Sequence, residues 1–193
     1  MEQNFLSHKQ RLYQQIQEQY GKLLYTYTCH LKKASALNKE SNRYKWAQII
    51  LSAISTGGFI ATVVTDQAKL AWIGGIVSTL LLVINGYLKD KDFAAERKAH
   101  TDTASKLWPL REEYLSLMTD FDDLPDETIV SQRDDLMEKT AKIYETAPQT
   151  DEKAYSAAQN ALKNKEEQFF TQEELNVMLP MHLRRTSEKE TKE

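Results

Sequence analysis

The stretch that decides the fold is "WAQIILSAISTGGFIATVVTDQAKLAWIGGIVSTLLLVINGYL", residues 46–88. It holds two apolar runs, 46–65 and 70–88, and neither contains Asp, Glu, Lys, Arg or His. As a helix each run would be roughly 30 Å long, the thickness of a bilayer's hydrocarbon core. We interpret the stretch as a transmembrane hairpin. The alternative is a hairpin buried in a soluble core, but a chain of 193 residues has little other sequence to cover it.

The link between the runs, residues 66–69, is short and contains Asp66 and Lys69. A spanning helix must satisfy its own backbone, so the chain has to reverse in water or among headgroups. Four residues leave no room for a domain on the far side. The first run also begins too far into the chain for a cleavable signal peptide, so it is expected to remain as an anchor.

Basic residues surround the hairpin unevenly. The fifteen-residue flanks carry nine and the link carries one. The flanking residues are Lys32, Lys33, Lys39, Arg43, Lys45, Lys89, Lys91, Arg97 and Lys98. The positive-inside rule therefore places both termini in the cytoplasm, and Trp46, Trp72 and Tyr87 fall near the span ends, where aromatic rings favour the interface.

The composition of the chain argues against some classes of protein. The net charge is −3 and the pI is near 5.9, which argues against a general nucleic-acid binder. The single cysteine, Cys29, excludes an intramolecular disulfide framework. Its neighbour His30 raises a metal site or a reactive thiol as one interpretation, and an ordinary cysteine on a helix face as the other.

No catalytic pattern is present in the sequence. There is no nucleotide-binding glycine loop, paired-cysteine motif or HExxH, and the four histidines are scattered. The acidic clusters at 120–123 and 134–135 could be metal ligands, but a turn and a solvated helix face explain them better. We therefore expect no enzyme, no cofactor, no metal and no catalytic residue.

The parts outside the hairpin are expected to be helical. Residues 3–44 form one helix or two, and the helix can continue into the membrane because no breaker lies between Asn42 and Trp46. One helix face collects the apolar residues Leu12, Ile16, Leu23, Tyr27, Leu31 and Ala34. After the second run no Gly or Pro occurs before Pro109, so that helix can also extend.

Further helices are expected at 110–121, 127–144 and 152–169. The first has an apolar face made of Leu110, Tyr114, Leu117, Met118 and Phe121. Asp151 is a plausible N-cap, and Thr171 with Glu174 forms a capping box for a short last helix that ends at Pro180.

The predicted fold class is therefore all-α: a membrane protein with a two-helix transmembrane hairpin and a cytoplasmic helical bundle. The predicted regions are an N-terminal amphipathic helix (1–45), the hairpin (46–88), a C-terminal helical region (89–184) and a disordered charged tail (185–193).

Polar residues follow one side of each apolar run. On a helical wheel of the first run, Gln48, Ser52, Ser55 and Thr62 fall within about 80° of one another. In the second run Ser78 and Asn85 share a face with Gly74. These six polar residues are candidate pore-lining residues. The alternative is that the hydroxyls bond their own helix or a neighbouring helix.

Small residues occupy the opposite side of the first run. Ala53, Gly57 and Ala61 recur every four residues, a pattern that lets membrane helices approach closely. With Gly74 and Gly75 they are the candidate helix-packing residues. One hairpin cannot surround water, so a pore requires a homo-oligomer.

The order of elements resembles the SLATT family, the two-transmembrane effector domains that accompany SMODS nucleotidyltransferases and SLOG proteins. The resemblance covers about residues 10–185, and its closing pattern includes "APQTDEKAYSAAQNALK" and "FTQEELNVMLPMHLR". The matching residues are Ala147, Pro148, Ala154, Tyr155, Ala158, Leu162, Phe170, Glu174, Leu179, Pro180, Leu183 and Arg184.

The resemblance implies an effector of a bacterial anti-phage or conflict system, located in the inner membrane. A sensor or nucleotidyltransferase encoded nearby would trigger it, and the effector would oligomerise and permeabilise the membrane. Its partners would be membrane lipid and further copies of itself. The rival hypothesis is a membrane-anchored scaffold whose cytoplasmic helices recruit a partner without forming a pore.

Overall fold

A computed structural model describes residues 7–65 and 68–184, and all regular structure within them is helical, which confirms the all-α prediction. Asp66 and Gln67 of the predicted turn and the tail from residue 185 lie outside the described residues. In chain order the elements are α1 (His8–Thr65), α2 (Ala68–Leu88), α3 (Phe93–Thr119), α4 (Asp126–Thr146), α5 (Glu152–Lys163), α6 (Gln172–Met178) and the 3₁₀-helix η1 (Met181–Leu183).

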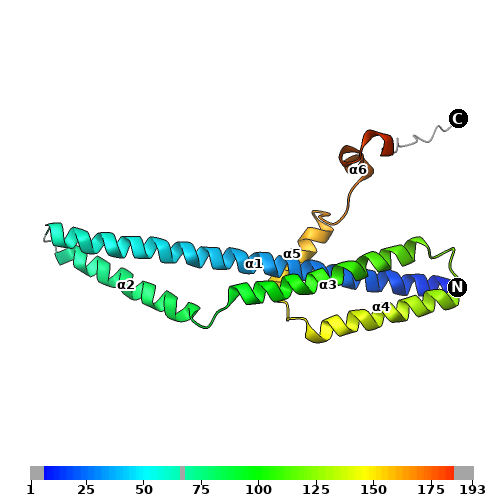
Figure 1. The fold of residues 1–193 in the computed structure, drawn as a ribbon, viewed down its shortest axis with the longest axis horizontal. Helices are drawn as coiled ribbons and strands as arrows, with labels where there is room; N and C mark the ends of the chain where they lie inside the picture. The colour runs from blue at the N-terminus through cyan, green and yellow to red at the C-terminus, as the bar shows by residue number, and fades with distance from the viewer. Residues whose placement is uncertain (1–6, 66–67, 185–193) are drawn as a thin grey trace, which may run out of the picture.

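Helix α1 is a single rod of 58 residues that joins the two halves of the molecule (Figure 1). At 1.5 Å per residue it is about 87 Å long. Its N-terminal half belongs to a helical bundle, and its C-terminal part is the first apolar run. The expected continuation from the N-terminal helix into that run is confirmed, because residues 42–46 contain no helix breaker.

Helices α2 and α3 return along α1, one after the other (Figure 1). They do not form one continuous helix, contrary to the expected extension of the second apolar run. Helix α2 ends at Leu88, and the charged residues 89–92 make a short joint. The Asp92 carboxylate accepts the backbone N–H groups of Ala94 and Ala95 at 3.1 and 2.9 Å, so α3 begins with its own N-cap.

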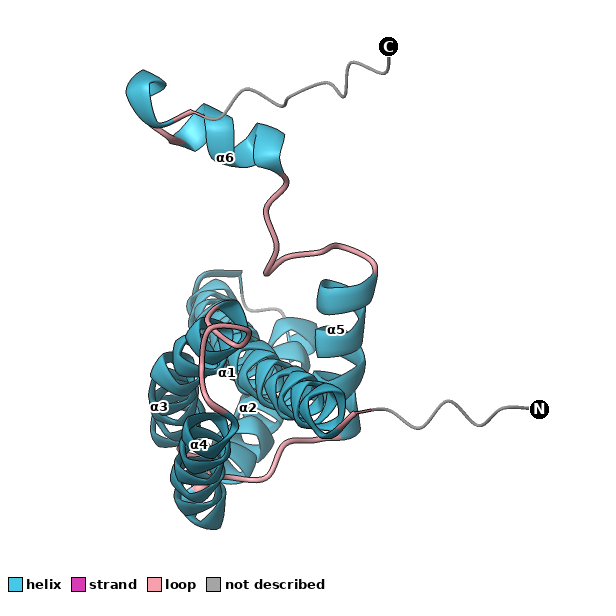
Figure 2. Ribbon diagram, turned by 90° about the vertical axis from the view of Figure 1, so that its right-hand side faces the viewer, coloured by secondary structure: helices cyan, strands magenta, loops and turns pink. Residues whose placement is uncertain are grey.

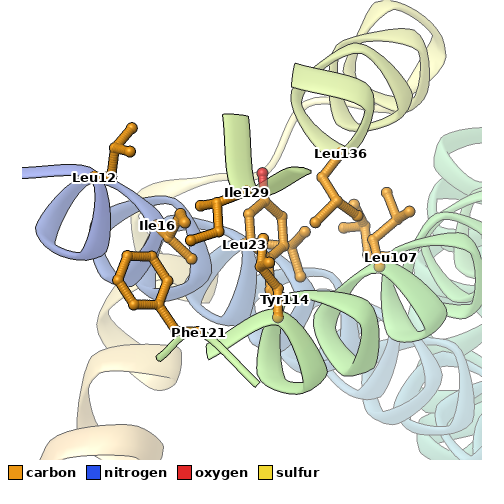
Figure 3. Close-up of a cluster of buried hydrophobic side chains, with 10 residues drawn as sticks. Leu12, Ile16, Leu23, Leu107, Tyr114, Phe121, Ile129 and Leu136 are labelled. Atoms are coloured by element: carbon orange, nitrogen blue, oxygen red, sulfur yellow. The ribbon is translucent and has the colours of Figure 1, made fainter. Parts of the chain in front are cut away.

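The core lies where α1, α3 and α4 meet (Figure 3). Ile16, Leu107 and Ile129, one from each helix, have no exposed surface. Fully burying a side chain of this size stabilises a fold by about 1.5–3 kcal/mol.

The predicted α1 face is largely confirmed, since Leu12, Ile16, Leu23 and Ala34 are buried and Tyr27 and Leu31 are half-buried. On α3, Leu110, Tyr114 and Leu117 are buried as predicted.

Helix α5 packs on α1 through its alanines, of which Ala154, Ala158 and Ala161 are buried. The predicted cap is confirmed, because the Asp151 carboxylate accepts the Ala154 N–H at 2.8 Å. The helix ends at Lys163, six residues before the predicted end. Glu166 then takes a left-handed conformation with φ of 51°, which a helix cannot accommodate.

The last segment, α6 and η1, stands apart from the bundle (Figures 1 and 2). The predicted capping box is confirmed, since the Glu174 carboxylate accepts the Thr171 N–H at 2.8 Å and the Thr171 hydroxyl accepts the Glu174 N–H at 3.3 Å. None of its residues is buried.

Candidate functional site

Within the described part of the chain, no other helix covers the apolar hairpin formed by α2 and the last third of α1. Phe59 on α1 is 70% exposed and Trp72 on α2 is 76% exposed. In the described part of the chain, one helical stretch is long and apolar enough to cross a membrane. It begins at Lys69, and its most apolar 18 residues are entirely unburied. Near the end of α1, the structure describes the backbone but not the side chains of Thr62, Val64 and Thr65.

The two helices meet along a regular seam. Most of the half-buried positions advance by four and three residues in turn, the spacing of antiparallel helices that pack side by side. On α1 they are Tyr44, Gln48, Leu51, Ser55 and Gly58, and on α2 they are Leu70, Gly74, Val77, Leu81, Ile84 and Leu88.

Two pairs of polar side chains bond across this seam. The Gln48 side-chain amide donates to the Asn85 side-chain oxygen at 2.7 Å. The hydroxyls of Ser55 and Ser78 also lie 2.7 Å apart. Four of the six candidate pore-lining residues therefore satisfy one another within one protomer. Of the other two, Ser52 is exposed beside the seam and the Thr62 side chain is outside the described residues.

The candidate packing residues divide between the seam and the outer surface. Gly58, which the sequence did not single out, approaches Gly74: a Cβ at Gly58 would lie 3.9 Å from the Gly74 Cα. Ala53, Gly57 and Gly75 are exposed on the outside of the hairpin, and a Cβ at either glycine would meet nothing within 4 Å. Ala61 is half-buried. The outer residues are therefore available to a neighbouring molecule.

A groove runs beside the seam near the glycines. Its walls include Ser55, Thr56 and Phe59 from α1 and Gly74 and Ser78 from α2. The absent side chain of Gly74 leaves it open, and hydroxyls lie along an otherwise apolar surface. Such a surface suits a helix that approaches closely and can exchange hydrogen bonds.

Outside the hairpin, a pair of buried histidines joins α1 to α3 in the bundle. The Nδ1 atoms of His30 and His100 lie 2.9 Å apart, and both rings are buried. Burial, together with the neighbouring His100, lowers the pKa of His30 to about 4. Burial and the charge of Lys33 lower the pKa of His100 as well. Both rings are therefore neutral near pH 7, with one nitrogen donating to the other.

The other residues that the sequence suggested as a reactive thiol or as metal ligands make structural contacts. Cys29 is buried, and burial raises the pKa of its thiol, which disfavours the reactive thiolate. His30 pairs with His100 rather than with Cys29. Asp134 and Asp135 lie on an exposed face, where they pair with Arg133 and Lys139. The described residues contain no group of three or more His, Cys, Asp or Glu that could hold a metal ion.

The similarity of this chain to known proteins is found at the level of a protein family. Neither the curated proteins nor the solved structures produced a match. The SMODS and SLOG-associating 2TM effector domain family 4 matches residues 12–174, from the first core residue of α1 into α6. Its name describes two membrane spans, as many as the apolar runs of this chain. The match covers most of the sequence, so the chain belongs to this SLATT family.

Proposed function

We propose that the protein is a membrane effector of a bacterial conflict system, whose hairpins cross the inner membrane and assemble into a pore. The single observation that carries this proposal is the row of polar residues along an uncovered apolar hairpin. Exposed side chains such as Phe59 and Trp72 need a non-aqueous surrounding. Polar side chains within such a surrounding are costly and generally serve packing or a solute path.

The proposed topology has both spans in the membrane and both termini in the cytoplasm. The uneven distribution of basic residues supports it. Cysteine labelling in a Cys29→Ala background tests it. A cysteine at Gln67 should react with an impermeant reagent added outside, whereas cysteines at Gln3 and Thr186 should stay protected. Labelling of either terminus from outside would contradict the hairpin.

The proposed pore needs several copies. The outer residues Ala53, Gly57 and Gly75 offer surfaces for close packing between protomers. In the single protomer four of the six candidate pore-lining side chains are paired, so we regard the isolated hairpin as the resting state. Assembly would turn Ser52, Ser55 and Thr62 of α1, together with Ser78 of α2, toward a shared water path, where hydroxyls keep the path hydrated without a buried charge.

The trigger is proposed from the family. Its members associate with SMODS or SLOG domains, so a nearby sensor or nucleotidyltransferase is the proposed partner. The bundle would receive the signal, because α1 connects it to the hairpin without interruption.

The pore is tested by replacing Ser52, Ser55 and Thr62 together with Ala. The triple variant should insert normally, since its helix is more apolar, but membrane depolarisation on overexpression should fall. Membrane level and oligomer size are the controls. Unchanged depolarisation in the variant would assign these hydroxyls to helix packing.

The second candidate function is a membrane-anchored scaffold, and the C-terminal segment favours it. Phe170, Val177 and Met181 are 61%, 79% and 82% exposed, which is typical of a segment that binds a partner. If the unmodified protein never depolarises cells under any trigger, while truncation after Gln168 abolishes its activity in the cell, the scaffold is the better description.

A further inference from the structure

The joint between α2 and α3 is held against α1 by aromatic rings. The Tyr44 ring on α1 lies 5.9 Å from the Tyr87 ring at the end of α2, and 5.9 Å from the Phe93 ring at the start of α3. These contacts fix residues 43–45 of α1 at the level of the joint, residues 89–92. Side chains from both segments therefore emerge around one end of the hairpin.

Basic side chains dominate this level. Arg43, Lys45 and Lys89 are exposed, and among the residues that the structure describes they form no ion pair. The Lys91 ammonium lies 4.6 Å from the centroid of the Tyr87 ring, which holds it beside them. In contrast, Lys32 and Lys33 deeper in the bundle are each paired with a carboxylate.

The nearby acids do not cancel these charges. Residues 39–45 and 89–92 together hold five basic and three acidic residues. The Asp92 carboxylate is occupied by two backbone N–H groups as the N-cap of α3. The surplus is positive, and it is exposed to whatever surrounds the joint.

The position of the surplus identifies what surrounds it. Trp46, the residue after Lys45, is 64% exposed and opens the uncovered apolar surface. The bases therefore lie where an apolar surface changes into a polar one, which is the depth of lipid headgroups in a bilayer. The groups of opposite charge at that depth are headgroup phosphates.

We propose that four basic residues at the level of this joint, Arg43, Lys45, Lys89 and Lys91, form a binding site for anionic phospholipid. It rests on the membrane insertion proposed above, but not on the pore. Because the joint connects the bundle to α2, a bound anion would hold α2 and α3 against α1 by screening the repulsion among the four bases.

Tryptophan quenching by brominated lipid tests the site, because the chain's three tryptophans can be separated. The variant Trp72→Phe/Trp108→Phe keeps Trp46 at the joint, and Trp46→Phe/Trp108→Phe keeps Trp72 near the start of α2, at the far end of the hairpin. Each is reconstituted in mixtures of brominated anionic phospholipid with plain phosphatidylcholine, and in the reverse labelling. Relative quenching gives the local preference for the anionic lipid.

The anionic lipid should be preferred around Trp46 by roughly fivefold, the factor that about 1 kcal/mol produces. Trp72 should show no comparable preference. Adding Arg43→Gln/Lys45→Gln/Lys89→Gln should remove the preference at Trp46. The matched control, Lys106→Gln/Lys153→Gln/Lys163→Gln, removes three exposed bases of the bundle and should leave it unchanged.

Each contrary result has a distinct meaning. Equal quenching by both lipids at Trp46, or a preference that survives the joint variant, overturns the lipid site. A preference lost in excess inorganic phosphate but not in chloride of the same ionic strength overturns it in favour of a free-anion site. If no brominated lipid quenches Trp46 or Trp72, the membrane insertion itself is wrong.

Discussion

The Ser55 and Ser78 hydroxyls lie 2.7 Å apart across the seam between α1 and α2, two turns from the equally close pair of Gln48 and Asn85. Each pair joins one residue of the first apolar run to one of the second. A hydrogen bond between membrane helices contributes about 0.6 kcal/mol on average. In the proposed transmembrane hairpin, two such bonds would hold one register and still be weak enough for the proposed assembly to exchange them.

A disulfide across the seam should lock the resting hairpin. In a Cys29→Ala background, Ser55→Cys/Ser78→Cys places two sulfurs where two hydroxyl oxygens already touch. Oxidation should form an intramolecular disulfide and abolish depolarisation or dye leakage, because the paired faces can no longer turn outward. A reductant should restore leakage. Leakage of reconstituted vesicles, measured before and after reduction, checks this.

The controls separate the lock from simple damage. Ser55→Cys alone should leak equally in oxidant and reductant. If the fully oxidised double variant leaks as well as the reduced one, the seam stays closed in the active state and the polar pairs are packing contacts. If even the unmodified protein does not leak, the pore is wrong and the lock is irrelevant.

Much of the fold could be predicted because its signals are local. The uncharged runs, the missing breaker before Trp46, and the capping residues Asp151 and Thr171 each act within a few residues. The end of α5, which differs from the prediction, depends on distant contacts. After α5 the chain leaves the helix at Lys163, where Glu167 pairs with Lys32 and the Gln168 side chain accepts from Arg111. Those partners lie on α1 and α3, more than fifty residues away.

The candidate site was less predictable, because a wheel gives the faces of one helix but not which face meets its neighbour. Gln48 and Ser55 share a face in the sequence, yet their partners Asn85 and Ser78 depend on how α2 is rotated about its axis. The same holds for the doublet Gly57-Gly58. Either glycine could have faced α2, and the structure places Gly58 there.

Stability of the bundle should fall between pH 6.5 and pH 4. His30 has a pKa of about 4 in the folded protein and about 6.5 when unfolded, so the unfolded state binds more protons in this window. The contribution is fully present above pH 6.5 and is lost as the pH falls toward 4. It amounts to at most about 3 kcal/mol. Thermal unfolding in detergent across this range measures it.

His30→Gln is the matched variant for this window. It removes the titrating ring and keeps a polar group, so its stability should depend less on pH between 6.5 and 4, even if it is lower overall. The Ala154 N–H and Lys32 lower the pKa values of the Asp151 and Glu167 carboxylates, respectively, and His30→Gln leaves both of these contacts in place. An unchanged slope in the variant would show that His30 is not the group responsible.

Asp151→Ala should loosen α5 from α1. The substitution removes both the N-cap and the 3.0 Å ion pair with Lys33, and the loss should be about 1–2 kcal/mol. Asp151→Asn keeps a cap acceptor but not the charge, so it should cost less. Hydrogen exchange of the α5 amides measures both. Equal exchange in Asp151→Ala and the unmodified protein would mean that the buried alanines alone fix the helix.

The adjacent glycines Gly57 and Gly58 should respond oppositely to the same substitution. Gly58 faces Gly74, so Gly58→Leu should force the helices apart at a cost of roughly 1–3 kcal/mol, and the Ser55→Cys/Ser78→Cys disulfide should then form slowly. Gly57 has open space around it, so Gly57→Leu should leave that disulfide unaffected. Because Gly57 lies on the proposed surface between protomers, its substitution should instead shorten the ladder of chemically crosslinked oligomers. If Gly57→Leu leaves the ladder intact, that surface faces lipid and the protomers assemble through another side of the hairpin. If Gly58→Leu does not slow the disulfide, the close approach of Gly58 and Gly74 is not what sets the spacing of α1 and α2.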